Sequence, residues 1–349
     1  MTSSVELSYR RPRADERVRL QELLRQHWRA DHIFVADSRW LDWQHLDADG
    51  KSFHAVIATT PDDRIVGFLG VMPYGRIGDD VLDLCTGIWI ALKGEGGGRA
   101  GLGLFRALEQ IYKPRFIGSL GVNPAASGVL RMIGHRSGSS QTYYVANPDM
   151  PDRLARQLDR GVPPELPASG EAWLDEVDSA AELAMFAAGR MPLKPAHWLA
   201  WRYGSGAPFT YRFLIAGREG GGAGVGIVMR VVEHGGARCL RISDVVGDIG
   251  SVGSLARSLV ALCRREKAEY IDCLAGGPGG EVLAKAGFRA AADPVVVPNY
   301  FDPFEQRNVT LGWTIKAPAA GGLLFRGDGD QDRPNRPSLE APRPRWQDQ

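Results

Sequence analysis

The stretch WLDWQ at residues 40–44 returns as WLAWR at residues 198–202, which is an offset of 198 − 40 = 158 positions. Three further pairs keep nearly the same spacing, with offsets of 158, 159 and 158: VIA at 56–58 with LIA at 214–216, VGF at 66–68 with VGI at 225–227, and LDL at 82–84 with LRI at 240–242. One such match is weak. A nearly constant offset over four elements indicates that a whole domain was duplicated.

Both halves show the same order of elements. A helix with two tryptophans precedes an apolar strand, a turn (residues 60–63 and 218–221) and two more strands; a helix, a strand and a short helix complete the half. In the first half, the helix that follows the three strands places Leu104, Leu108 and Ile111 on one face. Its counterpart in the second half places apolar residues at the same helical spacing: Val252, Leu255, Leu259 and Leu262. This order predicts an α/β fold, with mixed α+β sheets in two tandem domains and an active-site cleft.

A proline-rich connector, GVPPELP at residues 161–167, separates the two halves. We therefore predict an N-terminal domain at residues 1–160, a C-terminal domain at residues 168–320 and an irregular tail at residues 321–349. The tail is rich in proline and poor in apolar residues beyond about residue 333, so its last dozen residues are expected to be disordered.

The composition is that of a globular protein, with 44% hydrophobic and 24% charged residues in a chain of 349 residues. A net charge of +1 creates no overall field for nucleic acid or an anionic membrane. The first 13 residues are polar and basic, unlike a signal peptide, and no apolar run approaches the ~20 residues that span a bilayer. We expect a soluble, cytoplasmic protein.

Four cysteines stand in apolar surroundings without the spacing of metal ligands: Cys85, Cys239, Cys263 and Cys273. They predict buried free thiols and no metal site. The tryptophan pairs of the repeat, Trp40 with Trp43 and Trp198 with Trp201, are interpreted as core residues of a helix face; stacking on a sugar or base is the alternative.

The main chemical signal follows the strand at residues 83–92, where GEGGGRAGLGL at residues 94–104 opens a helix. Glycines let backbone N–H groups approach a pyrophosphate, and the helix N-terminus adds partial positive charge. Arg99 adds a formal charge at the same point. No Gly-Lys-Ser/Thr completes a P-loop, and no G-x-G-x-x-G near the N-terminus indicates a Rossmann domain. A glycine-rich loop that binds nothing remains the alternative.

These residues resemble the acyl-CoA loop of the GNAT (Gcn5-related N-acetyltransferase) superfamily, Gln/Arg-x-x-Gly-x-Gly/Ala. GRAGLG at residues 98–103 supplies its glycines, with Gly98 at the Gln/Arg position and Arg99 displaced by one. The family's later pattern, Asn-x-x-Ala-x-x-Leu-Tyr-x-x-x-Gly-Phe, is similar to residues 123–135, where Leu130 replaces the tyrosine that often protonates the thiolate. The resemblance implies acyl-CoA as cosubstrate and CoA as product, held by Trp89, Ile90, Gly98, Arg99, Ala100, Gly101, Leu102, Gly103 and Asn123.

The second half keeps the family's ending, LAKAGF at residues 283–288, but not the loop. GDIGSVG at residues 247–253 puts an acid where phosphate would bind. One degenerate loop in two copies implies one cofactor site, in the first domain, with the second domain helping to build the acceptor site.

Two closing motifs, VPNYFDPF at residues 297–304 and GDGDQDRPN at residues 327–335, resemble bacterial tandem GNAT proteins that N-acylate nucleotide-linked amino sugars for surface polysaccharide. The implied acceptor is a dTDP- or UDP-linked deoxyamino sugar, bound by Asn299, Tyr300, Asp328, Asp330, Asp332 and Arg333. Without the resemblance, a solvated acidic turn is the alternative for the run of aspartates. A calcium loop would need a glycine at its sixth position and a glutamate at its twelfth.

Acyl transfer from a thioester needs a neutral amine, a stabilised oxyanion and a thiolate that can leave. Asp244 and Asp83 are acids inside apolar strands, where burial is costly without a partner or a task. They are the candidate bases, with His135 third, and structural hydrogen bonding is the alternative for both acids. Backbone N–H groups near Trp89 and Ile90 would meet the oxyanion, where the strand should separate from its neighbour.

Two other functions stay open. One is a peptidoglycan-bridge transferase of the same fold that uses aminoacyl-tRNA, which would need a basic RNA-binding surface. The other is a non-catalytic binding protein made of decayed GNAT domains, which Gly98 and Leu130 favour and the glycine loop and Asn123 oppose.

Overall fold

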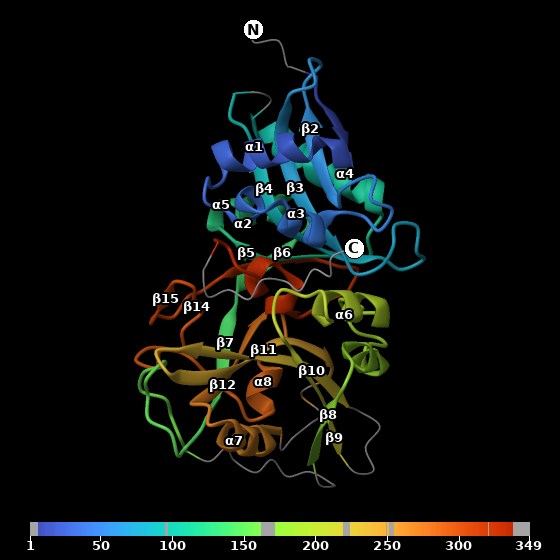
Figure 1. Ribbon diagram of the computed structural model, residues 1–349. Coiled ribbons are helices and arrows are strands. Elements are labelled where there is room, and N and C mark those ends of the chain that lie inside the picture. The colour runs from blue at the N-terminus through green and yellow to red at the C-terminus, as the bar shows by residue number, and fades with distance from the viewer. Residues whose placement is uncertain are drawn as a thin grey trace. The chain divides into compact units, whose positions relative to one another are not determined.

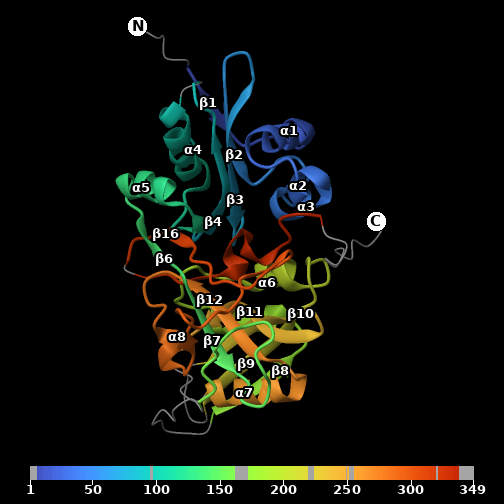
Figure 2. The same ribbon diagram turned by 90° about the vertical axis from the view of Figure 1, so that its left-hand side faces the viewer.

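The computed structural model describes residues 6–94, 97–161, 172–218, 224–248, 250, 255–319 and 321–337 (Figures 1 and 2). It divides into two compact units. Unit 1 comprises Met1–Ser119 and Pro334–Ala341, and unit 2 comprises Leu120–Arg333 and Pro342–Gln349. The predicted connector at residues 161–167, the turn at residues 218–221 and the end of the tail lie mostly or wholly outside the described residues.

Unit 1 is a sheet with helices on both faces. Figure 2 shows α4 on one face and α1–α3 on the other. The strand order is β1-β2-β3-β4-β5, antiparallel except for the β4–β5 pair. Its elements are β1 (Ser8–Arg10), η1 (Ala14–Glu16), α1 (Arg17–His27), α2 (Ile33–Ala36), α3 (Ser38–His45), β2 (Ala55–Thr59), β3 (Ile65–Pro73), β4 (Asp83–Ala91), α4 (Gly97–Tyr112) and the first part of β5 (Phe116–Val122).

The sequence of unit 1 explains this layering. Every residue of β2 is buried, as expected for a strand covered on both faces. Leu104 and Leu108 of α4 are fully buried at the helical spacing that the sequence predicted. The side chain of Asp37 accepts a hydrogen bond from the backbone N–H of Arg39 and caps α3, which fixes where that helix begins.

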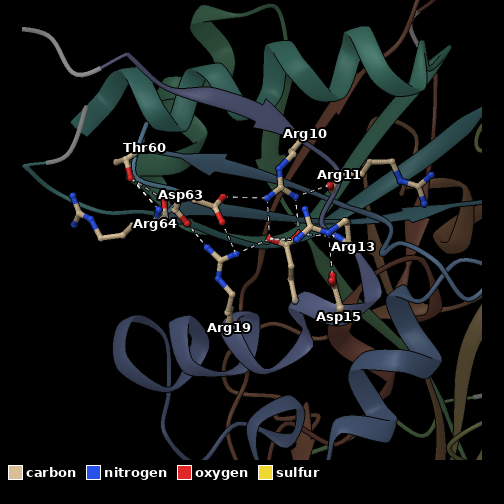
Figure 3. Close-up of polar contacts among 9 residues, drawn as sticks. Arg10, Arg11, Arg13, Asp15, Arg19, Thr60, Asp63 and Arg64 are labelled. Carbon is tan, nitrogen blue, oxygen red and sulfur yellow. Dashed lines mark hydrogen bonds and ion pairs between the residues drawn. The ribbon is translucent and has the colours of Figure 1, made fainter.

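A charged cluster fixes β1 to α1 and to the turn between β2 and β3 (Figure 3). Arg10 donates two hydrogen bonds to Glu16, at 2.6 and 2.8 Å. Arg19 contacts Glu16 at 2.8 Å and Asp63 at 3.0 Å. The hydrogen bonds from Arg10 lower the pKa of Glu16 to about 2, although the residue is only 1% exposed and burial opposes this shift. The first strand is therefore held by a buried carboxylate whose charge is compensated.

Unit 2 contains a second sheet, in the order β13-β7-β12-β11-β10-β9-β8, and the short strand β17 also pairs with β12. Strands β16 and β6 pair antiparallel outside this sheet. Its elements are α5 (Pro124–Met132), β6 (Arg136–Ser139), β7 (Gln141–Ala146), β8 (Ala172–Val177), η2 (Ala180–Phe186), α6 (Ala196–Tyr203), β9 (Arg212–Arg218), β10 (Val225–His234), β11 (Ala237–Gly247), α7 (Leu255–Glu266), β12 (Tyr270–Gly276), α8 (Val282–Lys285), β13 (Arg289–Ala290), β14 (Tyr300–Phe301), β15 (Phe304–Glu305), β16 (Gly312–Lys316), β17 (Leu324–Phe325), η4 (Arg326–Asp328) and η5 (Asp330–Asp332).

The predicted duplication is confirmed by the order of elements. Helix α3 and strands β2–β4, followed by α4 and β5, recur as α6 and β9–β11, followed by α7 and β12. Helices α3 and α6 begin 196 − 38 = 158 residues apart, which is the offset of the tryptophan motifs. The prediction of mixed sheets in two tandem copies is also confirmed.

The compact units do not coincide with the predicted ranges 1–160 and 168–320, because residues 120–160 belong to unit 2. The physical reason is strand β7. It pairs antiparallel with β12 along its whole length, from Ala146 opposite Tyr270 to Gln141 opposite Ala275. The assignment of separate tasks to the two domains stays a prediction.

Burial confirms most of the predicted core. All four cysteines are buried free thiols. Trp40, Trp43 and Trp198 are buried, but the prediction is wrong for Trp201, which is 39% exposed. In the described part of the chain, no helix combines the length and the apolar character needed to cross a bilayer.

Candidate functional site

Strand β4 extends well beyond its pairing with β5. The parallel ladder runs from Asp83 opposite Phe116 to Thr86 opposite Ser119, whereas β4 continues to Ala91. Strand β4 has a bulge just after Thr86, where the ladder with β5 ends. Leu69 and Val71 of β3 are two residues apart, but their partners Trp89 and Thr86 in β4 are three apart. Residues 87–91 therefore have no β5 partner in the described ladder, and this edge of β4 is not paired with β5.

The end of the β4–β5 ladder is marked by two buried hydroxyl groups. Thr86 Oγ1 and Ser119 Oγ lie 2.5 Å apart, and each residue is only 4% exposed. Either hydroxyl can donate the hydrogen bond to the other. Position 86 is also the one that the 158-residue offset matches to Asp244.

Helix α4 begins at Gly97 and contains the predicted residues Gly98, Arg99, Ala100, Leu102 and both later glycines, whereas Glu95 and Gly96 lie outside the described residues. A Cβ atom at Gly103 would lie 2.1 Å from the hydroxyl of Tyr9, and one at Gly101 would lie 3.0 Å from the Trp89 ring. A side chain at Gly103 would displace Tyr9, and one at Gly101 would press on the Trp89 ring, so packing inside unit 1 favours glycine at both positions.

Two side chains near the start of α4 differ in exposure. Arg99 is exposed and makes no ion pair within the described residues, and its backbone oxygen accepts a 3.4 Å hydrogen bond from Tyr9. The Trp89 ring meets the Phe105 ring edge-on at 4.9 Å. Its buried Nε1 has no hydrogen-bond partner among the described residues. A guanidinium in the first helical turn suits an anionic ligand.

Two further residues of the family pattern have structural tasks. Asn123 caps α5, because its Oδ1 accepts a 2.9 Å hydrogen bond from the backbone N–H of Ala126. Leu130, at the tyrosine position, is 1% exposed. The role of Asn123 in cofactor binding stays a prediction.

Asp83 and His135, two of the predicted bases, are both buried. The Asp83 carboxylate is fully buried and receives the Arg115 guanidinium on both oxygens, with Nε at 2.9 Å from Oδ1. His135 is 4% exposed, and burial together with the charge of Lys316 lowers its pKa to about 4. Its imidazole is therefore neutral at pH 7 and holds a proton weakly.

Asp244 lies at the centre of a buried ionic cluster in unit 2. Its Oδ1 binds the Lys194 ammonium and accepts the backbone N–H of Val245 at 2.8 Å, and its Oδ2 accepts the Tyr203 hydroxyl at 2.8 Å. Lys194 also contacts Asp328 at 2.7 Å. Burial raises the pKa of Asp244 to about 6, although the Lys194 charge opposes this shift.

The sequence analysis did not identify Lys194. The only signal was a lone lysine among apolar residues and prolines, in MPLKPAHW at residues 191–198. Such a lysine ordinarily lies at the surface, but this one is 3% exposed because two carboxylates surround it.

The acidic run near the end of the chain is also internal to unit 2. Asp328, Asp332 and Arg333 are 1%, 0% and 6% exposed, so the interpretation as a solvated turn is wrong. Asp332 contacts Arg230 at 3.1 Å and accepts the Tyr211 hydroxyl at 2.9 Å. These residues hold their own segment in place, and contact with an acceptor stays a prediction.

The other predicted acceptor residues differ in exposure. Asp330 is half-buried and contacts Arg333 at 3.2 Å. Asn299 is 3% exposed, and its Oδ1 accepts a hydrogen bond from Arg326. Tyr300, in β14, is half-buried. Among the predicted acceptor-binding residues, Asp330 and Tyr300 thus keep part of their side chains accessible to a ligand.

No protein-family model matches this chain, and no curated protein sequence does. Among solved structures, it is similar to a probable N-acyltransferase of unknown function from Enterococcus faecalis, with 11% identity and a TM-score of 0.51 over 88% of this chain and 72% of that one. Two GCN5-related N-acetyltransferases are also similar. The one from Anabaena variabilis has 14% identity and a TM-score of 0.51, over 89% and 72% of the chains; the one from Kribbella flavida has 13% and 0.50, over 91% and 72%.

These likenesses establish the class of fold. The chain has the GNAT fold in two copies, as the sequence predicted. At such low identity, they do not extend to the reaction or its substrates.

Proposed function

We propose that this protein is an acyl-CoA-dependent N-acyltransferase that binds acyl-CoA along β4 and at the start of α4. The observation that carries the proposal is the end of the β4–β5 ladder at Thr86 and Ser119, five residues before β4 itself ends (91 − 86 = 5). A strand edge freed in the middle of a sheet is rare without a use, because its N–H and C=O groups need partners.

The chemistry of acyl-CoA suits this edge. Its extended pantetheine arm carries amide groups, which can pair with residues 87–91 as an added strand would. Its pyrophosphate would meet the first turn of α4 and the exposed guanidinium of Arg99.

The transfer forms a bond between the acceptor nitrogen and the thioester carbon and breaks the bond from that carbon to sulfur. The amine gives up one proton, and the leaving thiolate takes one. Leu130 has no proton to supply, so we propose that the thiolate receives its proton from water or from the amine.

Three residues are candidates for the acceptor of the amine proton. Asp244, Asp83 and His135 stay candidates, but each is buried, so a role in catalysis would need a water or another side chain to carry the proton to it. The Thr86–Ser119 hydroxyl pair lies at the end of the β4–β5 ladder, where the proposed cofactor edge of unit 1 begins.

For the acceptor, we propose the amine of a nucleotide-linked deoxyamino sugar, such as a dTDP- or UDP-sugar used in surface polysaccharide. The support is the resemblance of the two closing motifs at residues 297–304 and 327–335. Transfer from aminoacyl-tRNA and simple ligand binding are the competing functions.

Thiol release from acetyl-CoA and longer acyl-CoA esters, measured over a panel of amino sugars with and without nucleotides, tests this function. We expect release only with nucleotide-linked amino sugars. Binding of acyl-CoA with no release on any acceptor would favour the non-catalytic function. Consumption of aminoacyl-tRNA without acyl-CoA would favour the tRNA-dependent transferase.

A further inference from the structure

The second copy also has a separated pair of strands, and the chain itself fills the gap. The parallel ladder between β11 and β12 ends at Ile242 opposite Cys273. Beyond it, β12 pairs with β17, with Ala275 opposite Phe325 and Gly276 opposite Leu324. The other edge of β12 is occupied by β7, since Ala275 also lies opposite Gln141. Strand β17 therefore occupies the edge of β12 that faces β11.

The position of β17 corresponds to the proposed cofactor position of the first copy. Asp83 pairs with Phe116, and Arg241 pairs with Asp272, so the offsets are 241 − 83 = 158 and 272 − 116 = 156. By these offsets, Thr86 and Ser119 of the first copy correspond to residues 244 and 275. In the second copy, Ala275 pairs with Phe325 of the inserted segment. Asp244 binds Lys194, which in turn binds Asp328 of the segment.

The segment is anchored from both strands and from α6. Asp328 binds Lys194, which also binds Asp244 of β11. The Asp328 carboxylate accepts the backbone N–H of Phe325 at 2.7 Å, which closes the turn after β17. From α6, Arg202 Nε donates a 3.0 Å hydrogen bond to the backbone oxygen of Gly327.

Close packing leaves little freedom around the turn. A Cβ atom at Gly327 would lie 1.8 Å from the hydroxyl of Tyr203. Leu324, Phe325, Arg326 and Asp328 are each at most 3% exposed. A cavity of about 340 Å³ remains beside the segment, and its wall carries the ion pair of Asp248 with Arg190 at 3.2 Å.

We infer that the groove between β11 and β12 is a binding site for an extended peptide, and that its permanent occupant is this chain's own segment at residues 324–328. The segment supplies the strand edge and the buried contacts that a pantetheine arm would otherwise make. The second copy is therefore closed to acyl-CoA, and the protein binds one acyl-CoA per chain. The stoichiometry rests on the proposed function, but the occupancy of the groove does not.

A disulfide across the Ala275–Phe325 pair tests this inference. Cβ atoms of directly opposed residues in an antiparallel pair lie near disulfide range, so the double variant Ala275→Cys, Phe325→Cys should form the bond on oxidation. We expect acyl-CoA to titrate to one site per chain, by calorimetry, with less than a twofold change in affinity between the oxidised and reduced forms. The single variant Ala275→Cys, treated identically, is the control for oxidation of the native thiols.

Two acyl-CoA sites in the reduced form and one in the oxidised form would overturn the inference. Hydrogen exchange of the unmodified protein tests the occupancy without any ligand. The amides of residues 324–328 should exchange as slowly as those of β12, and exchange about a hundredfold faster would also overturn it. If no acyl-CoA binds in any form, the proposed function fails, and the exchange result still decides whether the segment fills the groove.

Discussion

The two copies of the fold differ at the place where their parallel strands separate, which is β4 from β5 in the first copy and β11 from β12 in the second. In the first copy, two small hydroxyl residues, Thr86 and Ser119, close the ladder, and the edge of β4 beyond them has no strand partner among the described residues. In the second copy, an acid stands at the position of Thr86, and a strand of the same chain fills the space. Both copies thus keep the separation of the two strands, but only in the second copy does another strand of the chain pair at that position. The position of Thr86 in the copy without a strand on this edge is occupied by Asp244 in the copy where β17 pairs with β12.

The largest expected effect comes from removing the cation that the second copy uses to hold its segment. Lys194→Met leaves the carboxylates of Asp244 and Asp328 buried without their shared ammonium. We expect the free energy of unfolding to fall by about 3–5 kcal/mol, the usual result of breaking a buried ion pair. Denaturant titration followed by circular dichroism measures it.

The exposed ion pair of Arg190 with Asp248 gives a matched control on the same cavity, and Arg190→Ala should change the free energy of unfolding by less than about 0.5 kcal/mol. Equal effects of the two substitutions would contradict the assigned role of Lys194.

In the first copy, the buried carboxylate of Glu16 holds the edge strand β1, and its lowered pKa predicts that the free energy of unfolding falls in acid. Hydrogen bonds from Arg10 lower the pKa of Glu16 from an ordinary value near 4.5 to about 2. A lowered folded-state pKa contributes stability above the unfolded pKa, and this stability is lost as the pH falls from about 4.5 towards 2. The free energy of unfolding, measured from pH 7 to pH 2.5, should lose part of this acid dependence in Glu16→Gln. An unchanged slope in that variant would show that other carboxylates govern it.

The variant Asp244→Asn tests whether Asp244, which stands at the position of Thr86 in the first copy, has a structural or a catalytic role. Its three hydrogen-bonded contacts predict a loss of about 1–3 kcal/mol in the free energy of unfolding. Under conditions where the variant is folded, kcat/KM tests the other role. A fall of roughly 10²-fold with unchanged stability would identify Asp244 as a general base, whereas lost stability with retained kcat/KM would make it structural.

Arg99→Ala tests the available edge of the first copy. Loss of one charge-assisted contact to phosphate should raise the Kd for CoA about tenfold, which calorimetry can measure. Arg106→Ala removes another exposed arginine, two helical turns further along α4, and should leave the Kd within twofold. Similar losses in both variants would indicate a general effect of charge, not a phosphate contact at the helix start.

The smallest expected effect is at the hydroxyl pair. Thr86→Val keeps the shape of the side chain but leaves the Ser119 hydroxyl without its partner, and should lower the free energy of unfolding by about 1 kcal/mol. Adding Ser119→Ala should recover most of that loss, since neither polar group then remains buried and unsatisfied. Failure of the second substitution to recover it would show that the hydroxyls make separate contacts.

The fold could be predicted from the sequence because the internal repeat gives the order and spacing of several helices and strands together. The tryptophan motifs and the strand triplets keep their spacing, and burial of Leu104 and Leu108 followed from helical periodicity. The filled groove could not be predicted. Strand β17 has only two residues, so it carries no periodic pattern, and its partner is set by β12, which lies about fifty positions earlier. The partners of Lys194 lie 50 and 134 residues away in the chain (244 − 194 and 328 − 194), beyond the reach of any local pattern.

Strand β7 has a consequence for the way the chain is made. Its partner β12 begins with Tyr270 opposite Ala146, so 270 − 146 = 124 residues must be synthesised before the pair can form. At about 5–20 residues per second, a ribosome needs roughly 6–25 s for that stretch. During this interval, the nascent chain presents an apolar strand containing Tyr143 and Tyr144 with both edges open. An unpaired strand edge can pair with another chain, so β7 is exposed to misassembly until β12 has been synthesised.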